Sequence, residues 1–294
     1  MRWETDMRLM KRRAHARVAA ISAFVIAQAL TFNAARAEDK TYVMKLGTAT
    51  INDSQHEWCK RFAAMVEKDS GGRIRGEIYP ASQLGPIPRE IEGVQFGAIQ
   101  GYIGPPEFAV GVDPRYEVVS APGLIANMAH GIRAASDPEL QKMMLSLGAD
   151  KGIHGAALFV AQPSSVIARD PIRHLADFKG KKLRVLAAEM QQAMIKHLGG
   201  TAVAMTLGDV LPALQQGAID GAVAAITVYT TMHYWDAANQ RQAWAQHGES
   251  ISLPANEQAE MMKSLAAVGS AVAKQKPEVE RAYQVFAAVA QRTK

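Results

Sequence analysis

Eight histidines are the side chains of this sequence that could most readily ligate a metal or transfer protons. They are His15, His56, His130, His154, His174, His197, His233 and His247. None stands in the HxH, HxxxH or HExxH spacing that brings two imidazoles to one metal ion. We therefore interpret them as ordinary surface or core residues, and expect no metal or other cofactor.

Nucleophilic chemistry has no recognisable motif either. The sequence lacks GxSxG, CxxC, GxGxxG and a Walker loop. Cys59 is the single cysteine, and its place beside Trp58 and Phe62 on a helical stripe indicates a small buried hydrophobic side chain. These absences argue against an enzyme, although catalytic groups can converge in space from distant positions. A secreted α/β enzyme stays open as an alternative.

The positive charge of the chain is concentrated at its N-terminus. The 294 residues contain 33 Lys and Arg against 28 Asp and Glu, but residues 1–37 hold seven of the bases and only two of the acids. The remaining chain has 26 of each and is neutral. A neutral folded part gives no support to a nucleic-acid partner, which requires a basic surface.

The N-terminus has the three parts of a secretory signal peptide. Residues 11–17 are basic, residues 18–32 are uncharged and mostly apolar, and Ala35-Arg36-Ala37 is an A-x-A cleavage site. An apolar run of 15 residues is short for a membrane span, which needs about 20. We predict cleavage after Ala37 and a periplasmic mature protein.

The elements that must position any site alternate between strand and helix. The spacing of apolar residues and the positions of turn residues predict two successive α/β units with mostly parallel sheets. The predicted strands are 42–47, 73–79, 100–104, 153–161, 182–186, 202–205 and 219–225, and the main helices are 53–70, 88–95, 139–147, 189–197 and 207–216. Residues 163–168 are predicted to cross between the units. Residues 257–292 are predicted to be helical, with a break at Pro277.

Three stretches resemble the solute receptors of TRAP (tripartite ATP-independent periplasmic) transporters, the DctP-type family. They are residues 79–85 (YPASQLG), 175–184 (LADFKGKKLR) and 213–221 (ALQQGAIDG). The second is similar to the family signature D-L-K-G-x-K-x-R, and the third to A-L-Q-x-G-x-x-D-G. The resemblance covers about residues 40–239. It implies a two-lobed periplasmic-binding-protein fold that closes on an organic acid and delivers it to a membrane permease.

The resemblance also implies a ligand site. Arg184, which ends the second stretch, is similar to the residue that grips the ligand carboxylate in this family. An arginine suits the task because its planar fork donates two parallel hydrogen bonds to a carboxylate. From composition alone, a solvated cation beside Lys181 and Lys182 would be the default interpretation. The other predicted ligand-contacting residues are Pro105, Leu207, Ile226 and Tyr229 as lining, with Thr48, Ser164 and Thr227 as hydroxyl groups.

The sequence departs from the family pattern where some members carry charged or polar residues. Ser164 and Ser165 stand where some members have a second arginine. Residues 222–226 are apolar where many members are polar, and residues 104–106 (GPP) stand where others have an acid. These departures remove charged and polar groups from the ligand site that the resemblance implies. They favour a monocarboxylate with an apolar or aromatic body over a sialic-acid-like or C4-dicarboxylate ligand.

The largest departure is an apparent internal deletion after about Asn239. Family members return there to the first lobe, whereas here the chain runs directly into a stretch resembling the end of their long helix. About 40–45 residues would be absent, and a lost strand would leave an unpaired sheet edge. A degenerate receptor without binding activity is therefore a second alternative.

The expected organisation has four parts. Residues 1–37 form the signal peptide, 38–163 lobe I, 164–240 lobe II, and 241–294 the C-terminal helices that pack on the lobes.

Overall fold

A three-stranded parallel sheet forms from the first part of the chain. In this computed structural model, which describes residues 40–234 and 251–294, β1 (Tyr42–Thr48) lies between β2 (Ile74–Tyr79) and β3 (Gly101–Ile103). Helices α2 (Ser54–Asp69) and α3 (Ile87–Gln95) make the two connections, as expected for parallel strands. α2 begins where the Asp53 carboxylate accepts the backbone N–H groups of Gln55 and His56. The predicted signal peptide and the segment around Asn239 lie outside the described residues.

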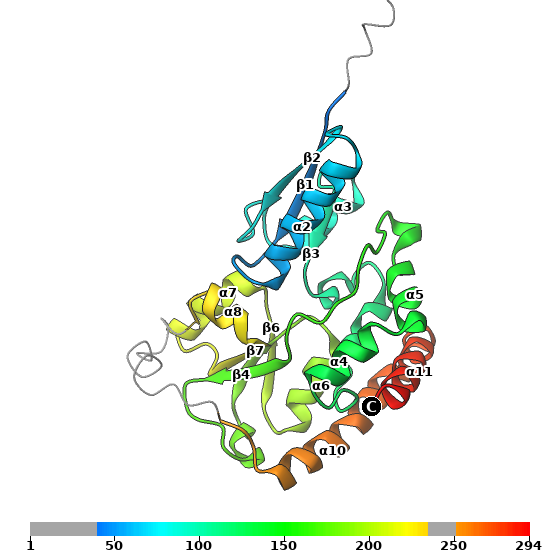
Figure 1. The fold of residues 1–294 in the computed structure, drawn as a ribbon. Helices are drawn as coiled ribbons and strands as arrows, with labels where there is room; N and C mark the ends of the chain where they lie inside the picture. The colour runs from blue at the N-terminus through cyan, green and yellow to red at the C-terminus, as the bar shows by residue number, and fades with distance from the viewer. Residues whose placement is uncertain (1–39, 235–250) are drawn as a thin grey trace, which may run out of the picture.

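A second, four-stranded sheet follows in the order β4-β7-β5-β6. Figure 1 shows it below the first sheet. Its strands β5, β6 and β7 run parallel, whereas the edge strand β4 is antiparallel to β7. The strands are β4 (Ser164–Ala168), β5 (Lys182–Val185), β6 (Thr201–Ala204) and β7 (Gly221–Ala225), and the helices are α6 (Glu189–His197), α7 (Leu207–Gln215) and α8 (Ile226–Thr231). The sequence prediction of α6 matches the observed helix, and residues 163–168, predicted as a crossing segment, largely form β4.

Short helical segments fill the chain between the two sheets. They are the 3-10 helices η1 (Pro106–Ala109), η2 (Pro114–Ser120) and η3 (Ala149–Lys151), the α-helices α4 (Met128–Ala135) and α5 (Pro138–Ser146), and, before β5, the 3-10 helix η4 (Leu175–Phe178). Buried side chains from these segments, from the second sheet's layer and from the C-terminal helices form the main hydrophobic core. Leu147, Met190, Val210 and Val289 are among its most enclosed members.

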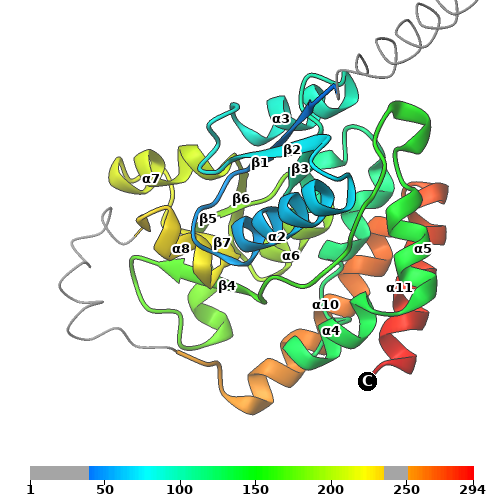
Figure 2. The same cartoon turned by 45° about the horizontal axis from the view of Figure 1, so that its top comes forward.

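The two C-terminal helices, α10 (Ala255–Ala273) and α11 (Pro277–Arg292), contact elements from both parts of the chain (Figure 2). α10 packs against α6, while α11 packs against η2, α4 and α5. The break between them falls just before Pro277, as the sequence predicts. His130 of α4 donates from Nε2 to the Ala290 carbonyl at 2.8 Å and accepts the Ala126 N–H on Nδ1. α11 is thereby fixed to the segment that follows the first sheet.

The predicted α/β class with two mostly parallel sheets is confirmed, but one predicted strand is wrong. Residues 153–161 run as extended chain outside both sheets. Strand hydrogen bonds need a neighbouring strand, and the structure places no strand beside this segment in the described parts of the chain. Phe159 is 38% exposed and its ring stacks 6.1 Å from that of Trp58 on α2. The division into lobes at residues 163 and 164 stays a prediction.

Within residues 40–234 and 251–294, we find no helix with the length and apolar character needed to span a bilayer.

Candidate functional site

Arg184 is completely buried in the middle of the second sheet. Its Nε donates to the Met205 carbonyl at 3.0 Å and its Nη1 donates to the Val223 carbonyl at 3.1 Å. Nη2 is buried and makes no hydrogen bond. Two nitrogens therefore fix the guanidinium against strand β7 and the end of β6, while the third keeps unused donor capacity. Burial lowers the pKa of Arg184, and the nearby Tyr234, Tyr229 and Glu107 oppose that shift.

Glu107 is a buried carboxyl group that faces the same region from the first half of the chain. It lies in η1, directly after the Pro105-Pro106 turn that ends β3. The Ser120 hydroxyl donates to Glu107 Oε1 at 2.8 Å. Burial raises the pKa of Glu107, and the Ser120 hydrogen bond and the positive charge of Arg184 partly offset the rise. Glu107 and Arg184 are therefore close enough for each to act on the other's ionisation.

A chain of hydrogen bonds continues from Glu107 to the strand that carries Arg184. Gln191 Nε2 donates to Ser120 Oγ at 3.4 Å, a long contact, and Gln191 Oε1 accepts the Leu186 N–H at 2.9 Å. Leu186 directly follows β5. The side chains of Ser120 and Gln191 thus connect the Glu107 carboxyl group to the end of β5.

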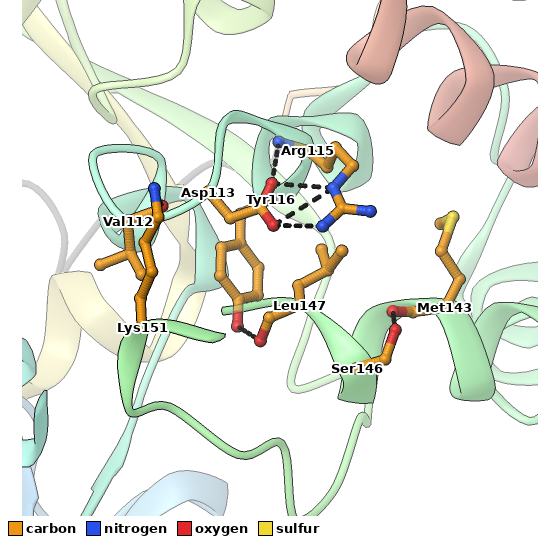
Figure 3. A network of polar contacts seen from close by, with 8 residues as sticks. All are labelled: Val112, Asp113, Arg115, Tyr116, Met143, Ser146, Leu147 and Lys151. Carbon is orange, nitrogen blue, oxygen red and sulfur yellow. Dashed lines mark hydrogen bonds and ion pairs between the residues drawn. The ribbon is translucent and has the colours of Figure 1, made fainter. Parts of the chain in front are cut away.

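The segment that carries Ser120 is itself anchored by a polar network (Figure 3). Asp113 caps η2 by accepting the Arg115 N–H, and its carboxylate also pairs with the Arg115 guanidinium at 2.5 Å. The Tyr116 hydroxyl donates to the Leu147 carbonyl at 2.7 Å, and Lys151 Nζ donates to the Val112 carbonyl at 2.9 Å. The network joins η2 to the end of α5, and joins Val112, just before η2, to the end of η3. It thereby fixes the segment that carries Ser120.

Several polar side chains of the first sheet are buried without a hydrogen-bond partner. Thr48 and Thr50 at the end of β1 have such hydroxyl groups, as does Tyr102 on β3. In the β-sheet register Tyr102 lies opposite Gly47. Its phenol also occupies the space that a Cβ on Gly104 would need. Buried polar atoms without partners are uncommon in proteins and often mark places that bind water or ligand.

Glu90 on α3 is the most unusual of these buried groups. It is 0% exposed, and neither carboxylate oxygen makes a hydrogen bond of normal geometry. Burial raises its pKa to about 7, with a small opposing effect from the Leu84 amide. A Cβ on Gly47 would lie 2.9 Å from the Glu90 carboxyl carbon, so the absence of a side chain at Gly47 makes room for this group.

The predicted site residues of the second sheet gather at one end of β7. The Tyr229 hydroxyl lies 2.5 Å from the Ser165 carbonyl, and Ser164 pairs with Ala225 in the sheet register. The Thr227 N–H donates to Gln162 Oε1 at 3.1 Å. Leu207 is buried in the main core, whereas Ile226 is 48% exposed. Burial lowers the pKa of Arg184, and Tyr229 is one of the groups that oppose this shift.

The remaining predicted residues, Thr48 and Pro105, belong to the first half of the chain. Thr48 is completely buried at the end of β1, and Pro105 is half-buried at the start of η1. The predicted site residues therefore come from both halves of the chain, and the contact of each residue with a ligand stays a prediction.

Sequence reasoning missed the acidic groups Glu90 and Glu107. Some family members have an acid immediately after the third strand, and residues 104–106 of this chain have none. The structure instead shows that the next residue, Glu107, lies in η1 and is buried, where the charge of Arg184 acts on it. An acidic group is thus present after the third strand. The single glutamate that follows Pro105-Pro106 is the sequence signal that could have indicated it.

Two surface hollows lie along α3, one of them beside the exposed Phe96. None of their lining residues is among the predicted ligand contacts. In the described part of the chain, no group of three or more His, Cys, Asp or Glu side chains has an arrangement suited to a metal ion.

Residues 47–240 match the family model of DctP, the bacterial extracellular solute-binding proteins of family 7. The C4-dicarboxylate-binding periplasmic protein DctP of Rhodobacter capsulatus is 30% identical over 167 residues, which are 55% of this chain and 48% of that protein. The chain spans about half the length of the curated relatives it matches.

Solved structures share the fold. The sugar acid binding protein DctPAm from Advenella mimigardefordensis, in complex with galactonate, superposes with a TM-score of 0.75 at 17% identity, over 87% of this chain and 99% of that one. A TRAP solute binding protein from Rhodoferax ferrireducens, in complex with copurified benzoate, gives 0.70 at 22% identity, over 86% and 98%. The family consists of solute-binding receptors and is not an enzyme class. The chain belongs to the DctP family of bacterial extracellular solute-binding proteins.

Proposed function

We propose that the protein is a periplasmic TRAP receptor that captures a small organic monocarboxylate and delivers it to a membrane permease. The unused Nη2 group of Arg184 carries this proposal. An enclosed guanidinium that is held by two backbone carbonyls and keeps free N–H donors is suited to bind a carboxylate. The ligand carboxylate would complete the hydrogen bonding of Arg184.

Similar proteins support an acid as the ligand. The relatives and solved structures named above bind C4-dicarboxylate, galactonate and benzoate. These compounds differ in size and polarity and have a carboxylate in common. The shared carboxylate supports an organic acid as the ligand of this chain. The rest of the ligand must be inferred from the residues of this chain.

The body of the ligand is proposed to be apolar or aromatic. Ser164 and Ser165 provide no second cation, and β7 contributes only small apolar side chains, residues 221–225. Pro105, Leu207, Ile226 and Tyr229 would line this part, and the hydroxyl groups of Thr48, Ser164 and Thr227 would bind polar atoms of the ligand. The buried hydroxyl groups of Thr48 and Tyr102 support some ligand polarity on the side of the first sheet.

A receptor without binding activity is the second candidate. The extended segment 153–161 favours it, because this stretch lies outside both sheets and carries the exposed Phe159. An unpaired extended segment with apolar side chains promotes aggregation. This candidate requires that the purified protein aggregates or melts without cooperativity.

Thermal unfolding of the purified protein with a panel of organic acids tests both candidates. A ligand present at 1,000 times its Kd adds about 4 kcal/mol of stability. For a chain of this length, Tm should rise by about 2–4 °C for each kcal/mol. We expect such a rise for monocarboxylates in the wild type and its loss in Arg184→Lys. Arg89→Lys on the surface of α3 is the matched control, because the Arg89 side chain is 73% exposed.

A cooperative transition that no acid shifts would contradict the proposed function. A transition without cooperativity would instead favour the degenerate receptor.

A further inference from the structure

We propose that Gln162 is a positioning residue of the ligand site, which holds Thr227 in place from the extended segment before β4. This inference rests on the proposed function, because Thr227 and its neighbour Ile226 are proposed ligand contacts. The Gln162 Oε1 atom accepts the Thr227 N–H at 3.1 Å, although the two residues lie 65 positions apart in the chain. Gln162 is half-buried and stands just ahead of the strand.

The hydrogen bond supplies what the local sequence of α8 lacks. The first N–H groups of a helix have no acceptor within the helix, and the side chain of the residue just before it often accepts one. Asp53, Asn127 and Asp137 do this for α2, α4 and α5. The corresponding residue of α8 is Ala225, whose methyl group cannot accept a hydrogen bond. Gln162 thus caps α8 from a distant segment.

The segment that carries Gln162 is itself attached to the first half of the chain. Gln141 Nε2 of α5 donates to the Leu158 carbonyl at 3.2 Å. The Phe159 ring stacks on the Trp58 ring of α2, with 6.1 Å between the ring centres and 15° between the ring planes. The hydrogen bond of Gln162 therefore places the start of α8 relative to α2 and α5, in addition to the strands of the second sheet.

A second contact limits the role of Gln162 to the start of α8. The Tyr229 hydroxyl lies 2.5 Å from the Ser165 carbonyl, which fixes the middle of this short helix to β4. Loss of the Gln162 acceptor therefore releases Ile226 and Thr227 and leaves the rest of α8 in place. A ligand then has to order two of its own contacts when it binds, and that ordering lowers its affinity.

Gln162→Met tests the proposal, because methionine has a similar length and its thioether is only a weak acceptor. Isothermal titration calorimetry of the full chain measures the Kd of benzoate, D-galactonate, D-glucuronate and succinate, and the tightest-binding probe is then used for every variant. We expect Gln162→Met to raise this Kd by about tenfold. Hydrogen exchange followed by NMR should show faster exchange of the Thr227 amide in the variant.

Gln100→Met is the matched control. Gln100 Oε1 likewise accepts a distant backbone N–H, that of Lys45 at 2.9 Å, and neither residue is a proposed ligand contact. This variant loses the same kind of hydrogen bond in the first sheet, and it should keep the wild-type Kd.

A local cap at α8 separates a positioning role from a general structural one. Ala225 has the extended backbone of a capping residue, with φ of −68° and ψ of 147°. In Ala225→Ser the new hydroxyl group can accept a first-turn N–H of α8 in place of Gln162. In this background we expect Gln162→Met to raise the Kd by less than about threefold, because the two caps replace one another.

Two results would overturn the inference and leave the proposed function standing. One is an unchanged Kd in Gln162→Met. The other is an equal rise of the Kd in the wild-type and Ala225→Ser backgrounds, which would mean that Gln162 does not act through the start of α8. If Gln162→Met does not fold, Gln162→Ser replaces it, since a serine side chain is too short to reach the Thr227 N–H. Absence of binding by every probe to a folded wild type would overturn the proposed function, and this inference with it.

Discussion

The hydroxyl oxygen of Tyr229 lies 2.5 Å from the Ser165 carbonyl oxygen, which joins α8 to the edge strand β4. The same hydroxyl accepts the Ala224 N–H at 3.0 Å and lies 3.1 Å from the carbonyl oxygens of Ala222 and Ala224. Tyr229 therefore satisfies backbone groups at the end of β7, where β4 and α8 meet. This bonding gives Tyr229 a structural role beside its proposed place in the ligand site.

We expect Tyr229→Phe to destabilise the protein by about 1–3 kcal/mol, because it leaves buried backbone groups without a partner. Urea unfolding monitored by circular dichroism measures the change. Tyr283→Phe is the control, since the Tyr283 hydroxyl makes a single, longer contact of 3.3 Å to the Ala266 carbonyl. Equal losses in the two variants would contradict the role assigned to Tyr229.

Glu90→Gln is expected to stabilise the protein at pH 8 by about 1–3 kcal/mol and to have little effect near pH 4.5. The folded-state pKa of Glu90 is raised to about 7 from an ordinary value of 4.5. The folded state therefore binds the proton more tightly than the unfolded state. The resulting stability is present below pH 4.5 and is lost as the pH rises to 7.

Unfolding of wild type and Glu90→Gln at several pH values tests this expectation. Glu92→Gln, on the same helix with a half-exposed side chain, should show no comparable dependence on pH. Equal stabilities of Glu90→Gln and wild type at pH 8 would refute a buried, unpaired carboxylate at this position.

Gly123→Ala should be among the most damaging single substitutions in the chain. Gly123 has φ of +80°, and an added Cβ would lie 2.5 Å from the Met262 carbonyl oxygen and the Ala266 nitrogen of α10. We expect a loss of about 3 kcal/mol or more, from backbone strain and steric overlap together. Gly180→Ala is the matched control because Gly180 has φ of +76° and open space at its Cβ position. That control should lose only about 1–2 kcal/mol, and thermal unfolding of both variants separates the two causes.

Glu257 links the start of α10 to the second sheet's layer. Its carboxylate accepts the Leu175 N–H at 2.7 Å and pairs with His174 Nδ1 at 2.8 Å. The pairing raises the pKa of His174, while the Leu175 N–H and then His174 lower the pKa of Glu257. The histidine contribution is present below pH 6.5 and is lost as the pH rises through its raised pKa. The glutamate contribution is present above pH 4.5 and is lost as the pH falls through its lowered pKa.

Glu257→Gln should therefore reduce Tm more at pH 5.5 than at pH 8.5. Differential scanning calorimetry at the two pH values measures this difference. A reduction that does not change with pH would mean that the Leu175 N–H bond alone holds the segment.

Local patterns predicted three strands of the second sheet, β5, β6 and β7, whereas β4 was predicted only as a crossing segment. The boundaries of α6 follow from a helical stripe that ends at Gly199-Gly200, and the strand of Arg184 follows from its alternation. These signals suffice because each lies within the element concerned. The strand predicted at 153–161 fails for the opposite reason, since a strand depends on a partner that the pattern of its own residues cannot reveal.

The candidate site was predictable only in part. Arg184 was predicted through the resemblance, and the structure adds that its buried Nη2 makes no hydrogen bond. Glu107 and Glu90 were not found, because the burial of a glutamate depends on how distant segments fold over it. The exposed position of Ile226 likewise depends on the path of the chain after β7.

Two hydrogen bonds join residues that lie 160 positions apart in the chain, His130 with Ala290 and Arg133 with Thr293. During synthesis, α4 emerges from the ribosome long before its partner α11 exists. Its polar contacts with α11 and Thr293 stay unmade until that segment has been translated, and such distant contacts also slow folding. The packing of α4 is therefore a late event in the making of this protein, because it waits for a helix that lies about 160 residues further along the chain.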